Sequence, residues 1–279
     1  MEFNFIKMLA TASKGVGTPH GIGDDAVKYG DGVIAKDIMV EGVHFTCLES
    51  LQSIVNRLFI SNISDIAAVG GLAGGYSALL AVAIPDYVNK VELAEAICAA
   101  ATRFDVDIIG GDTTSSKGGL FLSLTIIGKA GNYFIGRDGA KVGDNVYLSR
   151  PVGMAKYELE RFGRYQQERL PERLLGEEFG RTGEVSACID ISDGLGRDLS
   201  HIASASGVKI MIDRELLVNL GRQTPPLHID CIVSSGEEYA LAFTLDKVIN
   251  GACLIGKVCS GSGVWLDDVE VSDRGYEHI

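Results

Sequence analysis

The sequence predicts a mixed α+β protein of two domains, and three observations support this. Segments with strand character and segments with helix character are mixed along the whole chain, and 35 glycines separate them. The chain has 279 residues, more than one hydrophobic core usually organises. The turn-rich stretch at 136–145, GRDGAKVGDN, has no apolar periodicity. We therefore expect a boundary near residues 136–143, with domains of residues 1–137 and 138–279.

The first predicted element is a β-hairpin in AVKYGDGVIAKDIMV, because two β-favouring stretches flank Asp31 and Gly32. If these two residues form the turn, Asp37 faces Ala26. If the turn lies one residue earlier, Asp37 faces Asp24. In either case the hairpin brings Asp37 close to the carboxylates of GDDA, an unfavourable arrangement unless a cation lies between them.

The rest of the first half predicts two helices and a strand. Residues 51–69 have apolar side chains at helical spacing, although Asn62 and Asp65 lie among them. Residues 91–104 form a second helix by the same criterion. The stretch at 108–119, IIGGDTTSSKGG, is interpreted as a loop that leads into a strand at 119–128.

The second half begins with a strand, NVYLS, and continues with the charged stretch at 158–179. Its mixed charges indicate a solvent-exposed helical face without a functional role. IDISDGLGRDLSHIASASG is typical of a strand end followed by a helix that ends near Gly207. Four further strands are expected, in VKIMID, CIVSS, YALAFTL and CLIGKV.

The net charge of −12 and the pI near 4.9 argue against a nucleic-acid or anionic-membrane partner, because polyanions would be repelled. A phosphate substrate would need a divalent cation between itself and the carboxylates. The six cysteines show no C-x-x-C spacing, so we expect buried free thiols in a reducing compartment. The chain shows neither a secretory signal at its start nor a membrane-spanning run, and a cytoplasmic protein is expected.

Aspartates recur where a glycine or tight turn adjoins a strand or helix, in GDD, GGD and DISDG, with Asp37 and Asp65 in addition. Hard oxygen ligands of this kind suit Mg²⁺. Each position alone has a simpler explanation, such as an Asp-Gly turn, a helix cap at Asp193 or a hydrogen-bonded structural Asp65. A lone histidine such as His44 is more often structural than functional. The P-loop, G-x-G-x-x-G, G-x-S-x-G and H-E-x-x-H motifs are absent from the sequence.

Taken together, GIGDDAV, KDIMVEGVHF, SNISDIAAVGG, IIGGDTTSS, GRDGAKVGD, IDISDGL and SSGEEYAL resemble the thiamine-monophosphate kinase family in order and approximate spacing. This family belongs to a superfamily with aminoimidazole ribonucleotide synthetase and selenophosphate synthetase. The resemblance spans nearly the whole chain. It implies a two-domain synthetase-like fold, with an N-terminal mixed sheet that forms a homodimer interface and a C-terminal α/β domain that closes the active site.

The resemblance also assigns roles to residues. It implies Mg²⁺ ligands that bridge the phosphates of ATP, namely Asp25, Asp37, Asp65, Asp112, Asp190 and Asp193. It implies nucleotide contacts at Phe104, Gly111, Arg137 and Ser192, Phe104 standing where the family often has a tyrosine. Contacts to thiamine monophosphate are implied for His44, Glu237 and Tyr276. No residue is assigned as a general acid, base or nucleophile, because the acceptor phosphate is already ionised near neutral pH.

The implied reaction is the direct, Mg²⁺-assisted, in-line transfer of the ATP γ-phosphoryl group to thiamine monophosphate. Ala35 and Lys36 depart from the family, which usually has hydroxyl residues there that help to ligate Mg²⁺, and Lys36 is expected to supply positive charge instead. The second half is also short. Two alternatives therefore stay open: another ATP-dependent enzyme of the superfamily, aminoimidazole ribonucleotide synthetase-like or hydrogenase-maturation-like, and a nucleotide-binding homologue that has lost catalysis.

Overall fold

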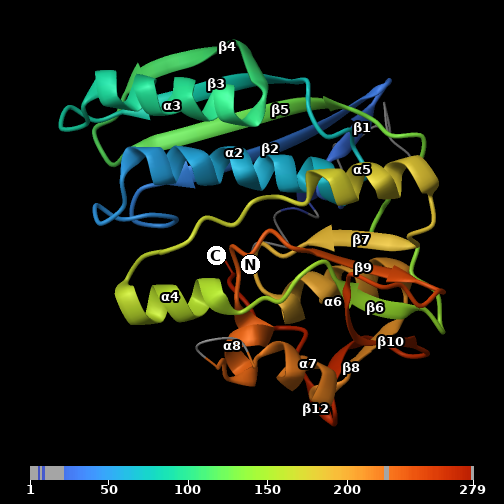
Figure 1. The fold of residues 1–279 in the computed structure, drawn as a ribbon. Helices are drawn as coiled ribbons and strands as arrows, with labels where there is room; N and C mark the ends of the chain where they lie inside the picture. Colours follow the sequence, from blue (N-terminus) through green and yellow to red (C-terminus); the bar gives the residue numbers. More distant parts are fainter. Residues whose placement is uncertain (1–5, 7, 10–21, 223–225, 278–279) are drawn as a thin grey trace.

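The first half of the chain forms a five-stranded sheet with the order β1-β2-β5-β3-β4 (Figure 1). The computed structural model describes residues 6, 8–9, 22–222 and 226–277. The strands of this first sheet are β1 (Val27–Tyr29), β2 (Gly32–Val40), β3 (Tyr76–Ile84), β4 (Val106–Ser115) and β5 (Phe121–Lys129). β3 and β4 are parallel and the other neighbours are antiparallel, so the sheet is mixed as predicted.

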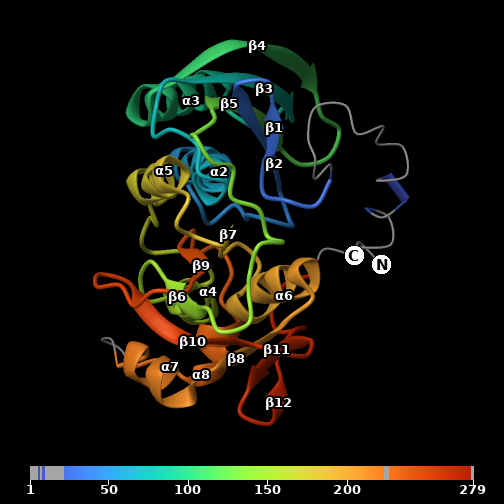
Figure 2. The same ribbon diagram turned by 90° about the vertical axis from the view of Figure 1, so that its right-hand side faces the viewer.

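Two helices cover one face of the first sheet, α2 (Leu51–Ala68) and α3 (Lys90–Phe104) (Figure 2). Both were predicted from their apolar spacing. Ser50 is the N-cap of α2, because its side chain accepts a hydrogen bond from the backbone N–H of Ser53 at 3.2 Å. The covered face of the sheet includes Leu122, Leu124 and Ile126, all fully buried.

The second half forms a seven-stranded sheet with the order β12-β11-β8-β10-β6-β9-β7. Its strands are β6 (Asn145–Leu148), β7 (Ala187–Asp190), β8 (Lys209–Ile212), β9 (Leu241–Leu245), β10 (Cys253–Cys259), β11 (Gly263–Leu266) and β12 (Val269–Glu270). Its helices are α4 (Met154–Phe162), α5 (Arg173–Thr182), α6 (Leu195–Ser206), α7 (Arg214–Leu220) and α8 (Ile229–Ser234). Residues 130–144, where the domain boundary was predicted, connect the two sheets without a helix or strand.

Helix α2 lies between the two sheets, with α5 beside its carboxyl end (Figure 1). Two glycines of α5 permit this approach. A Cβ atom on Gly176 would lie 2.3 Å from the carbonyl oxygen of Ala67, and one on Gly180 would lie 1.8 Å from that of Gly70. The carboxyl end of α2 is therefore in direct backbone contact with α5, a helix of the second half, and the functional side chains of α2 can reach groups of both halves.

The hairpin has the second of the two registers considered, with its turn at Gly30-Asp31, since Tyr29 pairs with Gly32. Three other predicted elements differ from the structure. The predicted loop at 108–119 is mostly strand β4, and the predicted strand CIVSS is mostly helix α8. The charged stretch at 158–179 is not one helix, because α4 ends at Phe162 and α5 begins at Arg173.

The cysteine prediction is only partly correct. All six cysteines are free, but only Cys188 is buried, while Cys47 and Cys98 are exposed. In the described residues, no helix combines the length and the apolar character needed to span a membrane.

Candidate active site

Three carboxylates from different parts of the chain meet between the two sheets. Asp25 precedes β1, Asp65 lies in the last turn of α2, and Asp190 ends β7. One carboxylate oxygen from each lies within 4.8 Å of the corresponding oxygens of the other two. We call these three residues the acidic cluster. Asp25 and Asp65 are 40 residues apart in the sequence, and Asp190 lies 125 residues beyond Asp65, so only the packing of α2 between the sheets brings the three together.

The acidic cluster is electrostatically unfavourable by itself. Burial raises the pKa of Asp65 well above its ordinary value, and Asp37, Asp190 and Asp25 raise it further. Burial and the charge of Asp25 likewise raise the pKa of Asp190. The Oδ2 atoms of Asp25 and Asp190 are buried, and within the described part of the chain they accept no hydrogen bond. Such orphaned oxygens are typical of positions where a cation binds.

Asp37 lies beside the acidic cluster, on β2. It pairs with the fully buried Leu124 of β5, and therefore faces the helix-covered side of the sheet. Burial raises the pKa of Asp37 to about 6, and the carboxylates of Glu237, Asp25 and Asp193 also act to raise it. Asp37 is thus a fourth carboxylate within electrostatic range of the cluster.

Arg137, predicted as a nucleotide contact, is the cation nearest to Asp25. Its Nη2 atom lies 2.5 Å from Oδ1 of Asp25, and its backbone N–H donates to Asp24 at 2.9 Å. Burial acts to lower the pKa of Arg137, but Asp25 and Asp24 raise it overall, so the guanidinium stays charged. Arg137 therefore compensates part of the negative charge at one side of the cluster.

Ser192 and Asp193 lie in the turn between β7 and α6. The turn is fixed by a residue that sequence reasoning missed, Asp198. Its buried Oδ2 atom accepts hydrogen bonds from the backbone N–H groups of Ser192, Asp193 and Gly194, at 3.1, 3.2 and 3.0 Å. A carboxylate four residues after Gly194, in GLGRD, was the available signal.

A cavity of about 270 Å³, which we call the Tyr276 pocket, adjoins this turn. It is lined by all three predicted substrate contacts, His44, Glu237 and Tyr276, together with Ser192 and Asp193. The predicted substrate side thus forms one pocket, and Ser192, assigned to the nucleotide, lines the same wall. Tyr276 is 52% exposed, and its backbone N–H donates to the carbonyl of Asp193 at 2.9 Å.

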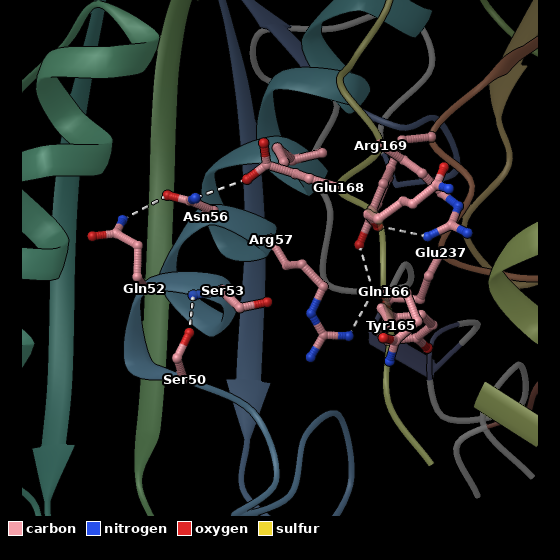
Figure 3. A pocket seen from close by; sticks show the side chains of 13 residues that line it. Ser50, Gln52, Ser53, Asn56, Arg57, Tyr165, Gln166, Glu168, Arg169 and Glu237 are labelled. Atoms are coloured by element: carbon pink, nitrogen blue, oxygen red, sulfur yellow. Dashed lines mark hydrogen bonds and ion pairs between the residues drawn. The ribbon is translucent and has the colours of Figure 1, made fainter. Parts of the chain in front are cut away.

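A second cavity of about 270 Å³, the Arg57 pocket, also has Glu237 in its wall (Figure 3). Arg57 of α2 contributes to its wall, with Asn56, Tyr165, Arg169 and Tyr239. Tyr165 and Glu237 line both pockets. Sequence reasoning did not single out Arg57, although an arginine among buried residues of an apolar helix gave the same signal that identified Asp65.

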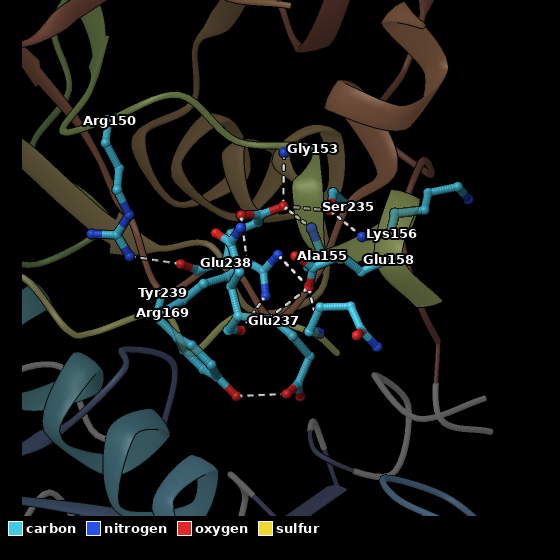
Figure 4. Close-up of polar contacts among 12 residues, drawn as sticks. Arg150, Gly153, Ala155, Lys156, Glu158, Arg169, Ser235, Glu237, Glu238 and Tyr239 are labelled. Carbon is cyan, nitrogen blue, oxygen red and sulfur yellow. Dashed lines mark hydrogen bonds and ion pairs between the residues drawn. The ribbon is translucent and has the colours of Figure 1, made fainter. Parts of the chain in front are cut away.

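The interpretation of the charged stretch at 158–179 as a solvent-exposed face is only partly correct, because several of its charged residues are exposed but Glu158 is buried and Arg169 is nearly so. Arg169 bridges two buried carboxylates, with Nη2 3.0 Å from Glu158 and Nε 3.2 Å from Glu238 (Figure 4). Glu238 also accepts from the backbone N–H groups of Gly153 and Ala155, at 2.7 and 2.9 Å. This network fixes the segment 163–172, which carries Tyr165, against the residues next to Glu237.

Three predicted site residues do not join the site within one chain. Phe104 is 3% exposed and stacks on Phe59 in the core, with ring centroids 6.2 Å apart, so its ring is not available to a nucleotide. Gly111 and Asp112 lie on β4, the edge strand, and Asp112 is exposed. A Cβ atom on Gly111 would lie 1.7 Å from the carbonyl oxygen of Leu80, which explains the glycine.

Asp112 lies far from Asp37 along the sheet and on its opposite face. Two strands lie between β2 and β4, so the distance is roughly 14 Å at the usual strand spacing. Asp112 pairs with Ala81, which pairs with Ser123, and this register places all three on the face opposite Asp37. Lys36 lies on that opposite face too, donating to Ser123 at 2.7 Å, so it does not supply charge to the acidic cluster.

Comparison with known proteins gives consistent results. Residues 23–130 match the family described as AIR synthase related protein, N-terminal domain. The chain is 31% identical to a thiamine-monophosphate kinase of Caulobacter vibrioides over 86% of this chain and 73% of the relative. It is 29% identical to one of Aquifex aeolicus over 92% of both chains.

The solved structure of AaThiL complexed with AMPPCP and TMP has a TM-score of 0.80 at 27% identity, over 100% of this chain and 97% of that one. The hydrogenase maturation protein HypE in complex with ATP has a TM-score of 0.64 at 17% identity, and this similarity shows the shared fold alone. The mixed fold with its two sheets is confirmed. With 31% identity to a relative of which it covers nearly three quarters, this chain belongs to the thiamine-monophosphate kinase family.

Proposed function

We propose that this chain transfers the γ-phosphoryl group of ATP to thiamine monophosphate, which gives thiamine diphosphate. The observation that carries the proposal is the acidic cluster, with three carboxylate oxygens within 4.8 Å, beside the Tyr276 pocket. His44, Glu237 and Tyr276 line that pocket, and Asp193 lies three residues beyond Asp190 of the cluster. The pocket is therefore the proposed acceptor site, and the cluster the proposed phosphate and metal site.

The residues of the acidic cluster fit Mg²⁺. All its donor atoms are carboxylate oxygens, which Mg²⁺ prefers, and two of them are buried without a hydrogen-bond partner in the described part of the chain. Burial first, and neighbouring carboxylates second, raise the pKa values of Asp65 and Asp190, and a divalent ion would offset both effects. Asp25, Asp65 and Asp190 would hold the ion, and Asp37, which interacts electrostatically with Asp25, Asp65 and Asp193, would add to the negative charge around it.

Bound Mg²⁺ supplies Lewis acidity and neutralises the phosphate charge that carboxylates would otherwise repel. The chain itself supplies position. Arg137, held at Asp25, is placed to interact with a phosphate oxygen once a metal ion balances Asp25. Asp198 fixes the Ser192–Asp193 turn between the two ligand sites. No general base is required, because the acceptor oxygen is already ionised near neutral pH.

The test is turnover of ATP with a panel of phosphate monoesters that includes thiamine monophosphate, with and without Mg²⁺, with chromatographic detection of thiamine diphosphate. We expect Mg²⁺-dependent formation of thiamine diphosphate and at least about tenfold weaker use of the other acceptors. ATP binding without any thiamine diphosphate product would instead support a nucleotide-binding homologue. A different preferred acceptor would support another enzyme of the superfamily.

We further propose that the active form is a homodimer in which the partner chain supplies Asp112. No described helix covers the face of the first sheet that carries Asp112, whereas α2 and α3 cover the other face (Figure 2). Exposed or half-exposed apolar residues, including Ile38 and Leu79, lie on this face. If two such faces meet across a two-fold axis, Asp112 of one chain can approach the acidic cluster of the other.

A further inference from the structure

Arg57 of α2 contacts three different walls of the two pockets. Its Nη1 atom lies 3.0 Å from Oε2 of Glu237, and its Nη2 atom donates to the carbonyl oxygen of His44 at 2.8 Å. The guanidinium carbon lies 4.7 Å from the centre of the Tyr165 ring. His44, Glu237 and Tyr165 come from distant parts of the sequence, and all three line the Tyr276 pocket.

Glu237 is held in an unusual conformation. Its φ angle is +57°, and that of Tyr239 is +51°, in the left-handed region that non-glycine residues seldom adopt. The Tyr239 hydroxyl donates to the same Oε2 atom of Glu237 that pairs with Arg57, at 2.8 Å. Two donors thus fix one carboxylate oxygen. Among the described residues Oε1 has no hydrogen-bond partner, and it remains available to a ligand in the Tyr276 pocket.

The burial of Arg57 argues against a role in stability alone. The residue is 6% exposed, and a second carboxylate, Glu49, lies 3.3 Å from its Nη2 atom. A buried guanidinium with two carboxylates is costly to desolvate, and replacement of such groups by apolar residues often leaves stability unchanged or improved. Stability alone therefore does not account for an arginine here, whereas its planar fork can hold several groups at defined angles.

We propose that Arg57 is a positioning residue for the acceptor: it holds Glu237, the backbone at His44 and the Tyr165 ring in a single arrangement around the Tyr276 pocket. This inference rests on the proposed function, because it assumes that the acceptor binds in that pocket. Arg57 itself contacts no reacting atom. It acts through Glu237 and His44, the two predicted substrate contacts that it touches.

The experiment compares Arg57→Lys with Arg169→Lys. Arg169→Lys is the matched control, because both arginines line the Arg57 pocket and both pair with two glutamates. Their side chains are 8% and 10% exposed. Lysine keeps the charge but loses the fork and the stacking. We expect Arg57→Lys to raise KM for thiamine monophosphate at least about tenfold, with KM for ATP changed less than about threefold. Arg169→Lys loosens the segment that carries Tyr165 but leaves Arg57 on Glu237 and on the backbone of His44, so it should lower Tm by a comparable amount and raise acceptor KM by a smaller factor than Arg57→Lys does.

A double-mutant cycle keeps the proposal testable if either variant folds poorly. Arg57→Lys with Glu237→Gln should raise acceptor KM little beyond the larger single effect, because both changes disrupt one arrangement. Multiplicative effects, or equal rises of the acceptor and ATP KM values in Arg57→Lys, would overturn the positioning role. A wild-type chain that neither binds nor phosphorylates thiamine monophosphate would overturn the proposed function itself, and the role of Arg57 with it. The wild-type measurement therefore separates the two failures.

Discussion

Replacement of Asp65 or Asp190 by asparagine separates a metal site from a structural cluster. The change keeps the shape but removes one of several mutually repelling buried charges. Phosphoryl transfer should fall about 100-fold to 1000-fold, because charge stabilisation in the transition state is lost. Tm in EDTA should stay equal or rise. A sharp fall in Tm with normal turnover by the folded fraction would identify a structural aspartate instead.

The raised pKa of Asp37 predicts how stability depends on pH. Burial raises this pKa from 3.8 in its ordinary state to about 6, so the folded protein binds the proton more tightly than the unfolded chain. The stabilisation from protonated Asp37 is complete below about pH 4 and is lost as the pH rises through 6. In EDTA, Asp37→Asn should therefore raise Tm more at pH 7.5 than at pH 4.5. In the presence of Mg²⁺, the rise in Tm at pH 7.5 should be smaller. Equal rises in Tm at the two pH values in EDTA would show that the pKa of Asp37 is not raised.

At the scale of single residues, the sequence was informative where a charge lay in apolar company or beside a glycine. Asp65 was recognised in this way, and its convergence with Asp25 and Asp190 was expected before the structure. Phe104 was assigned by resemblance alone, and its burial against Phe59 depends on tertiary packing that no local pattern shows. Arg57 and Arg169 were overlooked because arginine is usually exposed, and only their carboxylate partners, far away in the sequence, make burial possible.

Among the elements, long periodic helices and the hairpin were predictable, whereas short apolar segments were not. Cys231–Ser235 was expected to be a strand and is mostly in α8, because five apolar-rich residues do not distinguish the two periods. Strand β4 was expected to be a loop because of its glycines, yet its parallel partner β3 supplies the hydrogen bonds that its own sequence does not favour. The hairpin register was left open between two turns, and the structure has the earlier one.

The network around Glu238 predicts how the segment 163–172 is held. Glu238→Gln removes one of the two buried carboxylates that pair with Arg169, so the guanidinium keeps only the carboxylate of Glu158. Breaking a buried pair costs about 3 to 5 kcal/mol, so Tm should fall by several degrees. Glu160→Gln is the matched control, since Glu160 is 61% exposed in its pair with Lys156 and should change stability by less than about 1 kcal/mol. Equal effects of the two variants in thermal melts would show that the network does not hold the segment.

For the whole molecule, the arrangement of the two halves explains why neither could form the site alone. The acidic cluster takes Asp25 and Asp65 from the first half and Asp190 from the second. The Tyr276 pocket takes His44 from the first half and Glu237 from the second. Helix α2 connects both sites, since Asp65 and Arg57 are two turns apart on it. A change in the relative position of the two halves would therefore alter the metal site and the acceptor pocket together.

The same reasoning extends to the proposed homodimer, and a mixed dimer tests it. Asp112 lies on the opposite face and the far edge of the first sheet from Asp37, so it cannot complete the cluster of its own chain. If the partner supplies it, Asp65→Asn and Asp112→Asn homodimers are both impaired. A heterodimer of the two variants, purified through two different tags, has one site with an intact cluster and an intact partner Asp112. It should recover about half of the wild-type turnover.

The alternatives give different results in the same assay. If Asp112 acts within its own chain, each site of the heterodimer carries one defect and no turnover returns. If Asp112 has no catalytic role, Asp112→Asn homodimers turn over normally, and exposed Asp112 should in any case leave Tm nearly unchanged. A wild-type chain that sediments only as a monomer at micromolar concentration would contradict the dimer itself. Turnover that returns in the heterodimer but is lost in both homodimers would place Asp112 at the partner's cluster. In that heterodimer the intact cluster comes from the Asp112→Asn chain and the intact Asp112 comes from the Asp65→Asn chain.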